Sequence, residues 1–194
     1  MNQMPGSRAL VRVLARVLAA ATCSGVAVFL LVMLALQGVQ SGYDPRTQFM
    51  SELALGVWGA WMMLAFVGLA LAAAATALNL YARAEARLLS GLLAFAAVLF
   101  LATGIVTLAD SALAHVAFIA SAFIASGTAM YLLPRAVAVF AKREGYAVSW
   151  GCSLIMCGAV AQGERFILTG SAQRVAACAL LCWFLYVAYQ LARR

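Results

Sequence analysis

Six long apolar segments dominate this sequence and constrain its fold more than any other feature. A helix needs about 20 apolar residues to cross the hydrocarbon core of a bilayer. No segment alternates with period two as the strands of a membrane barrel do, and lipid cannot satisfy a free backbone. We therefore predict an all-α, polytopic integral membrane protein, a compact bundle of about six transmembrane helices that forms a single domain over residues 1–194. The expected spans are Val17–Leu36, Leu53–Leu80, Leu88–Ala109, Ala112–Leu133, Ala147–Gly163 and Val175–Leu191.

The overall composition agrees with this interpretation. Hydrophobic residues make up 66% of the chain and charged residues 10%, whereas soluble domains carry about 25% charged residues. A soluble fold of this size cannot hide so much apolar surface. The net charge of +7 does not indicate nucleic-acid binding, because the longest basic runs are the pairs Lys142-Arg143 and Arg193-Arg194. Small residues four apart, such as Gly68 and Ala72, predict close helix contacts in lipid.

The distribution of Lys and Arg predicts the orientation. Ten of the 13 basic residues fall at the two ends of the chain or in the loops that share a side with them, and only Arg46, Arg165 and Arg174 fall on the other side. Cytoplasmic loops carry the excess of Lys and Arg. We therefore expect a multi-pass protein of the cell (inner) membrane with cytoplasmic N- and C-termini. The first apolar segment continues to Leu36, which favours a retained helix over a cleaved signal peptide.

With this orientation, most acidic residues and the single histidine gather at the outer face. They come from three loops, together with two arginines, and intramembrane ionisable groups are functional candidates by default. Carboxylates can activate water, an imidazole can move a proton, and arginine can hold an anionic head group. The candidate catalytic residues are Glu52, Asp110, His115 and Glu164, and the candidate ligand-binding residues are Arg46, Ser51 and Arg165.

Helix capping is an alternative explanation for several of these residues. Ser51 can cap the second helix, with Glu52 in its first turn where the helix dipole favours a carboxylate. Asp110 or Ser111 can cap the fourth helix in the same way. Asp110 and His115 are five residues apart, about 140° around an ideal helix, so they converge only if Asp110 lies in the turn.

The remaining candidates have structural alternatives too. Glu164 follows the fifth helix, where the dipole disfavours a carboxylate, so an ion pair with Arg165 or Arg46 is expected. Such a pair would tie two loops together. His115 lies in an apolar run and can be a buried neutral imidazole bonded to a neighbouring acid.

Metal and cofactor binding find little support in the sequence. One histidine excludes a bis-histidine haem and a three-histidine zinc site. Cys178 and Cys182 are four residues apart and could hold a soft metal, but five cysteines in apolar runs fit small buried side chains better. No phosphate loop or dinucleotide fingerprint is present. We expect no metal and no cofactor.

Several short motifs are similar to those of one family. The chain contains Tyr43-Asp44-Pro45, Ser51-Glu52-Leu53, Asp110, His115 and Gly163-Glu164-Arg165. At these positions it resembles the prokaryotic membrane proteins catalogued as Domain of Unknown Function nine-nine-eight. The resemblance implies a six-helix layout over nearly the whole chain, and it implies no activity. This sequence departs from the family pattern in having Ala54 after Ser-Glu-Leu, and in lacking a proline before Asp110.

Three functional hypotheses follow. The first is an outer-face polar pocket that binds or acts on an amphiphilic, lipid-like ligand, with membrane lipids as partners; whether it is an enzyme stays open. The second is a non-enzymatic membrane subunit or assembly factor in which the same residues form structural ion pairs. The third is a proton-coupled carrier, which the lack of obvious inverted repeats and broken helices disfavours.

Overall fold

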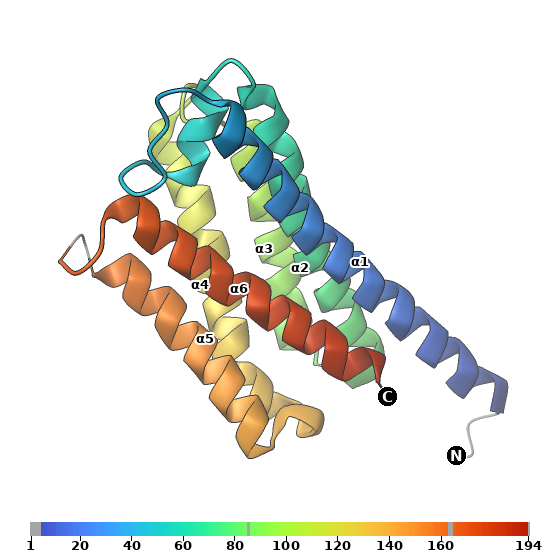
Figure 1. Cartoon of the computed structure of the whole chain (residues 1–194). Coiled ribbons are helices and arrows are strands. Elements are labelled where there is room, and N and C mark those ends of the chain that lie inside the picture. The colour runs from blue at the N-terminus through green and yellow to red at the C-terminus, as the bar shows by residue number, and fades with distance from the viewer. Residues whose placement is uncertain (1–4, 85, 163–164, 194) are drawn as a thin grey trace.

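The computed structural model describes residues 5–84, 86–162 and 165–193, which are helical with connecting turns and contain no strand. Six α-helices account for most of these residues, and three short 3-10 helices lie in the connections (Figure 1). The α-helices are α1 (Pro5–Val39), α2 (Met62–Ala84), α3 (Arg87–Ile105), α4 (Ala112–Ala136), α5 (Arg143–Ala161) and α6 (Thr169–Ala192). The 3-10 helices are η1 (Met50–Leu55), η2 (Gly59–Trp61) and η3 (Ala138–Phe140).

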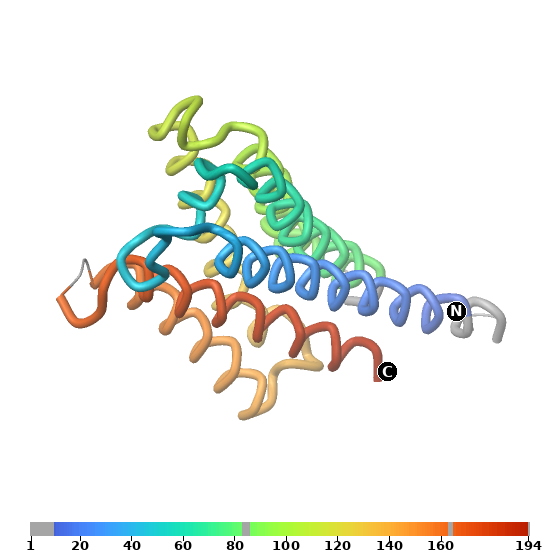
Figure 2. Tube along the Cα trace, turned by 45° about the horizontal axis from the view of Figure 1, so that its top comes forward, coloured from blue at the N-terminus to red at the C-terminus, as the bar shows by residue number. Residues whose placement is uncertain are grey.

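The α-helices form a closed ring. Each packs against its neighbour in the sequence, and α6 returns to pack against α1. Figures 1 and 2 both show α1 and α2 side by side, and α5 beside α6. The beginning of α1 and the end of α6 lie at the same end of the bundle. The short connections therefore alternate between two ends.

Five helices are long and apolar enough to cross a membrane, judged by length and composition. They are Leu10–Val39, Gly59–Ala82, Arg87–Ile105, Ala112–Ala136 and Thr169–Ala192. The sixth expected span is the 19-residue helix α5, which is not among these five. Arg143 and Glu144 occupy its first turn, and Ser149 and Ser153 lie within it, so its apolar content is lower. The finding supports a helical membrane protein with at least five candidate spans in the described part of the chain.

The second expected span begins later than the sequence suggests. Instead of one helix from Leu53, the chain forms η1 and η2 and enters α2 only at Met62. Two glycines explain the break, because glycine disfavours a continuous helix. The backbone N–H of Gly59 donates to the Gly56 carbonyl at 2.9 Å, and the position of a Gly59 Cβ is occupied by the Ala54 carbonyl. The segment folds back on itself at this point.

Small residues allow α1 and α2 to pack closely, as the spacing of Gly68 and Ala72 predicts. A Cβ on Gly25 would lie 2.8 Å from the Ala72 backbone nitrogen, and a Cβ on Gly68 would lie 2.6 Å from the Gly25 carbonyl oxygen. Only glycine fits these two positions without moving a backbone. In lipid the hydrophobic effect does not drive helices together, so close van der Waals packing of this kind stabilises their association.

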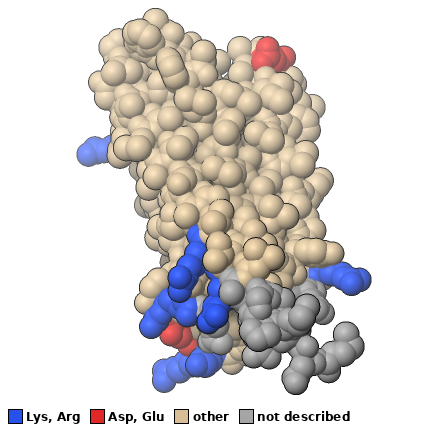
Figure 3. All heavy atoms as spheres, turned by 90° about the vertical axis from the view of Figure 1, so that its right-hand side faces the viewer, with Lys and Arg blue, Asp and Glu red and all other residues tan. Residues whose placement is uncertain are grey.

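Basic side chains mark one end of the bundle, which we call the basic end. Figure 3 shows Lys and Arg gathered at the end where α1 begins, with an acidic side chain among them. We call the opposite end the loop end; it contains η1, η2, the turn between α3 and α4, and the start of α6. The described basic residues towards this end are Arg12, Arg16, Arg87, Arg135, Lys142, Arg143 and Arg193.

Candidate functional site

The loop end is built around the start of α6. A Cβ on Gly170 would lie 2.7 Å from the Pro45 carbonyl oxygen and 2.8 Å from that of Arg46, so the first loop packs directly on the helix backbone. The Ser171 backbone N–H donates to the Arg46 carbonyl at 3.0 Å. Glycine at position 170 therefore permits a contact that joins residues more than 120 positions apart in the sequence.

Arg174 holds this arrangement from one turn further along α6. Its guanidinium donates to the Gly170 carbonyl at 2.9 Å, to the Gln48 carbonyl at 3.3 Å and to the Tyr43 hydroxyl. A weaker contact reaches Gln37 Oε1 at 3.4 Å. These acceptors are neutral oxygens on α1, the first loop and α6. The half-buried cation thus cross-links three segments through hydrogen bonds.

Tyr43 remains a neutral phenol in this network. Burial raises the pKa of Tyr43 above its usual value, and the carboxylates of Glu52 and Asp44 act in the same direction, while Arg174 lowers it. The net direction is upward, so the hydroxyl keeps its proton at neutral pH. The Tyr43 hydroxyl lies 3.0 Å from the Phe49 carbonyl, to which it donates.

Glu52 is engaged with its own neighbours in the sequence. One carboxylate oxygen accepts the Phe49 backbone N–H at 2.8 Å, and the other accepts the Gln48 side-chain amide at 3.1 Å. The carboxylate therefore caps the beginning of η1. The predicted cap by Ser51 is not found: η1 and not α2 begins here, Phe49 is its N-cap residue, and Glu52 lies in its first turn.

Asp110 closes the turn between α3 and α4. Its Oδ2 accepts the Thr107 backbone N–H at 2.9 Å and the Thr107 hydroxyl at 2.8 Å. These two hydrogen bonds lower the pKa of the exposed Asp110 carboxyl. Ser111, not Asp110, caps α4, by accepting the Ala114 N–H at 3.3 Å.

His115 lies at the first turn of α4 with only 1% of its surface exposed. Its Nδ1 is 2.8 Å from the carbonyl oxygen of Val106, the C-cap residue that directly follows α3. A carbonyl can only accept, so Nδ1 carries the hydrogen, and in the neutral ring Nε2 is then an acceptor. Nε2 is buried and has no hydrogen-bond partner among the described residues. The bonded partner is a backbone carbonyl and not the neighbouring acid that the sequence suggests.

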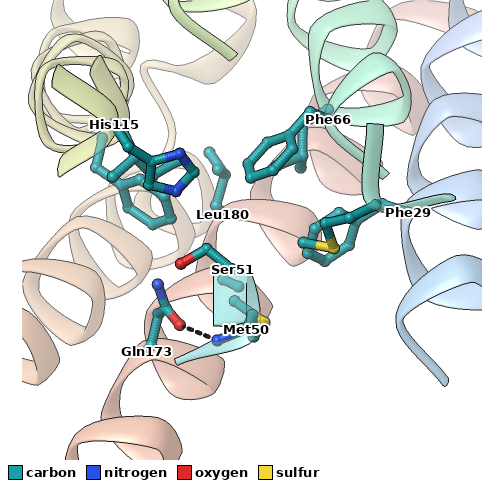
Figure 4. Close-up of a pocket in the computed structure, with 12 residues that line it drawn as sticks. Phe29, Met50, Ser51, Phe66, His115, Gln173 and Leu180 are labelled. Atoms are coloured by element: carbon teal, nitrogen blue, oxygen red, sulfur yellow. Dashed lines mark hydrogen bonds between the residues drawn. The ribbon is translucent and has the colours of Figure 1, made fainter. Parts of the chain in front are cut away.

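A small cavity of about 20 Å³ adjoins this unpartnered nitrogen, enough for about one water molecule. Figure 4 shows Ser51, Gln173 and His115 pointing towards the same space. The Gln173 side-chain oxygen accepts the Met50 backbone N–H, which fixes η1 against α6. The other walls are apolar and come from α1, α2, α4 and α6: Phe29, Met62, Phe66, Leu69, Ile119, Phe123, Ala177 and Leu180.

The structure brings together two of the seven candidate residues, Ser51 and His115, which line this cavity. Glu52 and Asp110 lie nearby in the sequence but bond within their own turns. Arg46 and Arg165 are exposed and do not line the cavity, and Glu164 lies outside the described residues. The expected pairing of Glu164 also lies outside them. The functional roles of all seven stay predictions.

Two residues that matter here were not among the candidates, namely Gln173 and Arg174. Both lie on α6, although the charge count along the sequence places Arg174 in the loop before that helix. Their signal in the sequence is a polar pair that directly precedes the apolar run from Val175. A polar side chain on a span needs a partner within the protein, because lipid offers none.

No metal centre is found in the described part of the chain, where no group of three or more His, Cys, Asp or Glu side chains could hold an ion. All five cysteines are free, and none is buried within the protein as expected: Cys152 is half-buried, and the other four, Cys178 and Cys182 of α6 among them, are exposed. His115, Ser51 and Gln173 can all form hydrogen bonds at the cavity, and an imidazole such as that of His115 can also move a proton.

Comparison with known proteins places the chain in a family. No curated protein and no solved structure matches it. The sequence pattern of one family, described as protein of unknown function (DUF998), matches residues 23–190. The match covers well over half of the chain and agrees with the resemblance of its short motifs. The chain therefore belongs to the DUF998 family.

Proposed function

We propose that this protein is a six-span protein of the inner membrane that binds the polar end of an amphiphilic, lipid-like ligand at its outer face. The observation that carries the proposal is the unpartnered Nε2 of His115, which adjoins a cavity also lined by Ser51 and Gln173. A buried polar atom without a partner is costly, by about 1–3 kcal/mol. A ligand group that bonds to Nε2 would remove this cost.

The cavity indicates the kind of ligand. Because Nε2 is an acceptor in the neutral ring, the bound group must carry a hydrogen, as a hydroxyl or a protonated acid does. The volume of about 20 Å³ admits one such small group. A cavity of this size cannot hold the hydrocarbon that follows, so the chain must lie outside it, along the apolar surface of the bundle. An aliphatic chain that ends in a hydroxyl meets both conditions.

The topology rests on the charge asymmetry between the two ends of the bundle. Lys and Arg gather at the basic end, which the positive-inside rule assigns to the cytoplasm, and α5 crosses as the sixth span. Single cysteines at the exposed positions Ser41 and Ala141 test this in a background without native cysteines. We expect an impermeant thiol reagent added outside the cell to label position 41 and not 141. Labelling at 141 alone would reverse the orientation and place the His115 cavity inside.

The ligand class can be tested with two matched amphiphiles, dodecanol and dodecyl methyl ether. Both are added to the purified protein in an amine-oxide detergent, which has no hydrogen to donate. At a concentration about ten times its Kd, the alcohol should stabilise the folded protein by roughly 1.4 kcal/mol. This corresponds to a rise of a few degrees in melting temperature. The ether should have no such effect.

Substitution then connects the effect to the cavity. In His115→Phe the difference between alcohol and ether should disappear, and in Asp110→Asn, which lies outside the cavity, it should persist. Equal stabilisation by the two compounds in the unchanged protein would refute the proposal.

The scaffold hypothesis keeps one specific observation in its favour. Arg174 joins α1, the first loop and α6 through hydrogen bonds, which is a structural role. This network does not line the His115 cavity. We therefore assign it to holding the outer loop in place, and we assign ligand binding to His115, Ser51 and Gln173.

A further inference from the structure

A second, larger pocket lies at the basic end, between the start of α5 and the end of α6. Its volume is about 460 Å³, which is within the usual range for small-molecule sites. It shares no residue with the His115 cavity. Its polar side chains are Lys142, Glu144, Tyr186, Tyr189, Gln190 and Arg193.

Both signs of charge meet in this pocket. Lys142 and Arg193 supply two cations and Glu144 supplies one anion, all on exposed side chains. The Gln190 amide donates to one Glu144 carboxylate oxygen at 3.5 Å, the limit of a hydrogen bond. The carboxylate is thus weakly held by the protein and can accept from a ligand.

Arg193 is positioned by an aromatic neighbour. Its Nη1 donates to the Tyr189 hydroxyl at 2.8 Å, and its guanidinium carbon lies 4.9 Å from the centre of the Tyr189 ring. The guanidinium has five N–H groups, so this contact leaves donors for a further acceptor. Arginine is well suited to phosphate, because its planar fork matches two phosphate oxygens.

We propose that this pocket binds the head group of a phospholipid that carries both a phosphate and a primary ammonium, as phosphatidylethanolamine does. The phosphate lies against Lys142 and Arg193, and the ammonium donates to Glu144. The pocket lies at the end of the bundle where the helices leave the apolar region, which is the depth of lipid head groups.

The aromatic contacts favour a primary ammonium over a trimethylammonium group. A quaternary ammonium has no hydrogen to donate and is recognised by the open faces of aromatic rings. Here Arg193 occupies the Tyr189 face, and the Tyr186 ring packs against Phe140 with 5.9 Å between centroids. The acceptors that remain are oxygens, which suit N–H donors.

Native mass spectrometry of the full chain can test the proposal. The purified protein is exposed to an equimolar mixture of phosphatidylethanolamine, phosphatidylcholine and phosphatidylglycerol with the same acyl chains. We expect phosphatidylethanolamine to bind about fivefold more than either other lipid, the ratio expected of one exposed charge pair. Soluble glycerophosphoethanolamine should compete, since the head group carries the recognition.

Substitutions divide the site into its two halves. Glu144→Gln should bring the ratio of ethanolamine to choline lipid to about one, and Lys142→Gln with Arg193→Gln should lower binding of all three lipids. Arg87→Gln removes a cation from the same end outside the pocket and should change neither. Equal binding of ethanolamine and choline lipids by the unchanged protein, strongest binding of phosphatidylglycerol, or an unchanged ratio in Glu144→Gln would overturn the proposal. It does not depend on the outcome at His115.

Discussion

Replacing His115 separates two contributions to the free energy of unfolding: the cost of the unpartnered nitrogen and the packing of the aromatic ring. Two variants are needed, His115→Phe and His115→Ala. The first keeps an aromatic ring that can pack edge-on against Phe66, as His115 does with 5.9 Å between ring centroids. The second removes the ring and leaves its volume empty.

The expected magnitudes follow from the contacts. In His115→Phe the Val106 carbonyl loses its donor, which costs about 1–3 kcal/mol, but the unpartnered Nε2 also disappears, which returns a similar amount. The adjoining cavity of about 20 Å³ gives room for the larger ring. The net change should be within about 1 kcal/mol. In His115→Ala the carbonyl is also stranded and a cavity is added, so the loss should be about 2–5 kcal/mol.

Thermal unfolding in the amine-oxide detergent without added ligand measures this difference. For about 190 residues, 1 kcal/mol corresponds to roughly 2–4 °C, so the alanine variant should melt roughly 5–15 °C below the phenylalanine variant. The starting protein and His115→Phe should melt within a few degrees of each other. A phenylalanine variant as unstable as the alanine variant would mean that Nε2 already holds a strongly bound partner. The cavity would then not be available to a ligand.

Three further predictions concern the scaffold. Gly68→Val should lower the folded yield sharply on gel filtration, because the new side chain meets the Gly25 backbone, whereas Gly91→Ala has open space and should be neutral or stabilising. Arg174→Leu should free the first loop, so that a cysteine at the buried position Met50 reacts at least tenfold faster with a thiol reagent than the same cysteine in a protein that keeps Arg174. An unchanged rate would remove Arg174 from its cross-linking role. The pKa of Asp110 is lower in the folded protein than the ordinary carboxyl value of 3.8, so its carboxylate stabilises the fold fully above pH 3.8. This stabilisation is lost as the pH falls through the lower, folded pKa. Asp110→Asn should therefore reduce the fall in melting temperature at acid pH.

The helical architecture could be predicted because it depends on apolar length alone. The boundaries of α3 and α4 agree closely with the segments Leu88–Ala109 and Ala112–Leu133. The start of α2 could not be placed, because two separated glycines can either sit within a membrane helix or break it. In this chain Gly59 packs against the Ala54 backbone, and the helix does not continue through this segment.

The candidate site was predicted less well for a different reason. Position along the chain identified Ser51 and His115, which do meet at one cavity. The sequence could not show that the carboxylates of Glu52 and Asp110 bond to Phe49 and Thr107. An acidic residue looks the same in a sequence whether its side chain caps a turn or faces a ligand. Only the directions of the side chains distinguish the two uses.

This distinction separates His115 from the carboxylates of the loop end. Both oxygens of Glu52 accept hydrogen bonds from residues within four positions, and the Asp110 bonds to Thr107 similarly complete the turn. Either carboxylate would have to give up these bonds before it could act on a ligand. His115 differs, because one nitrogen fixes the ring on Val106 and leaves the other directed at a space with no protein partner. A group that is held in place and still has an unused lone pair is ready to bind, so we expect a binding site at this end to centre on His115 and not on the acids around it.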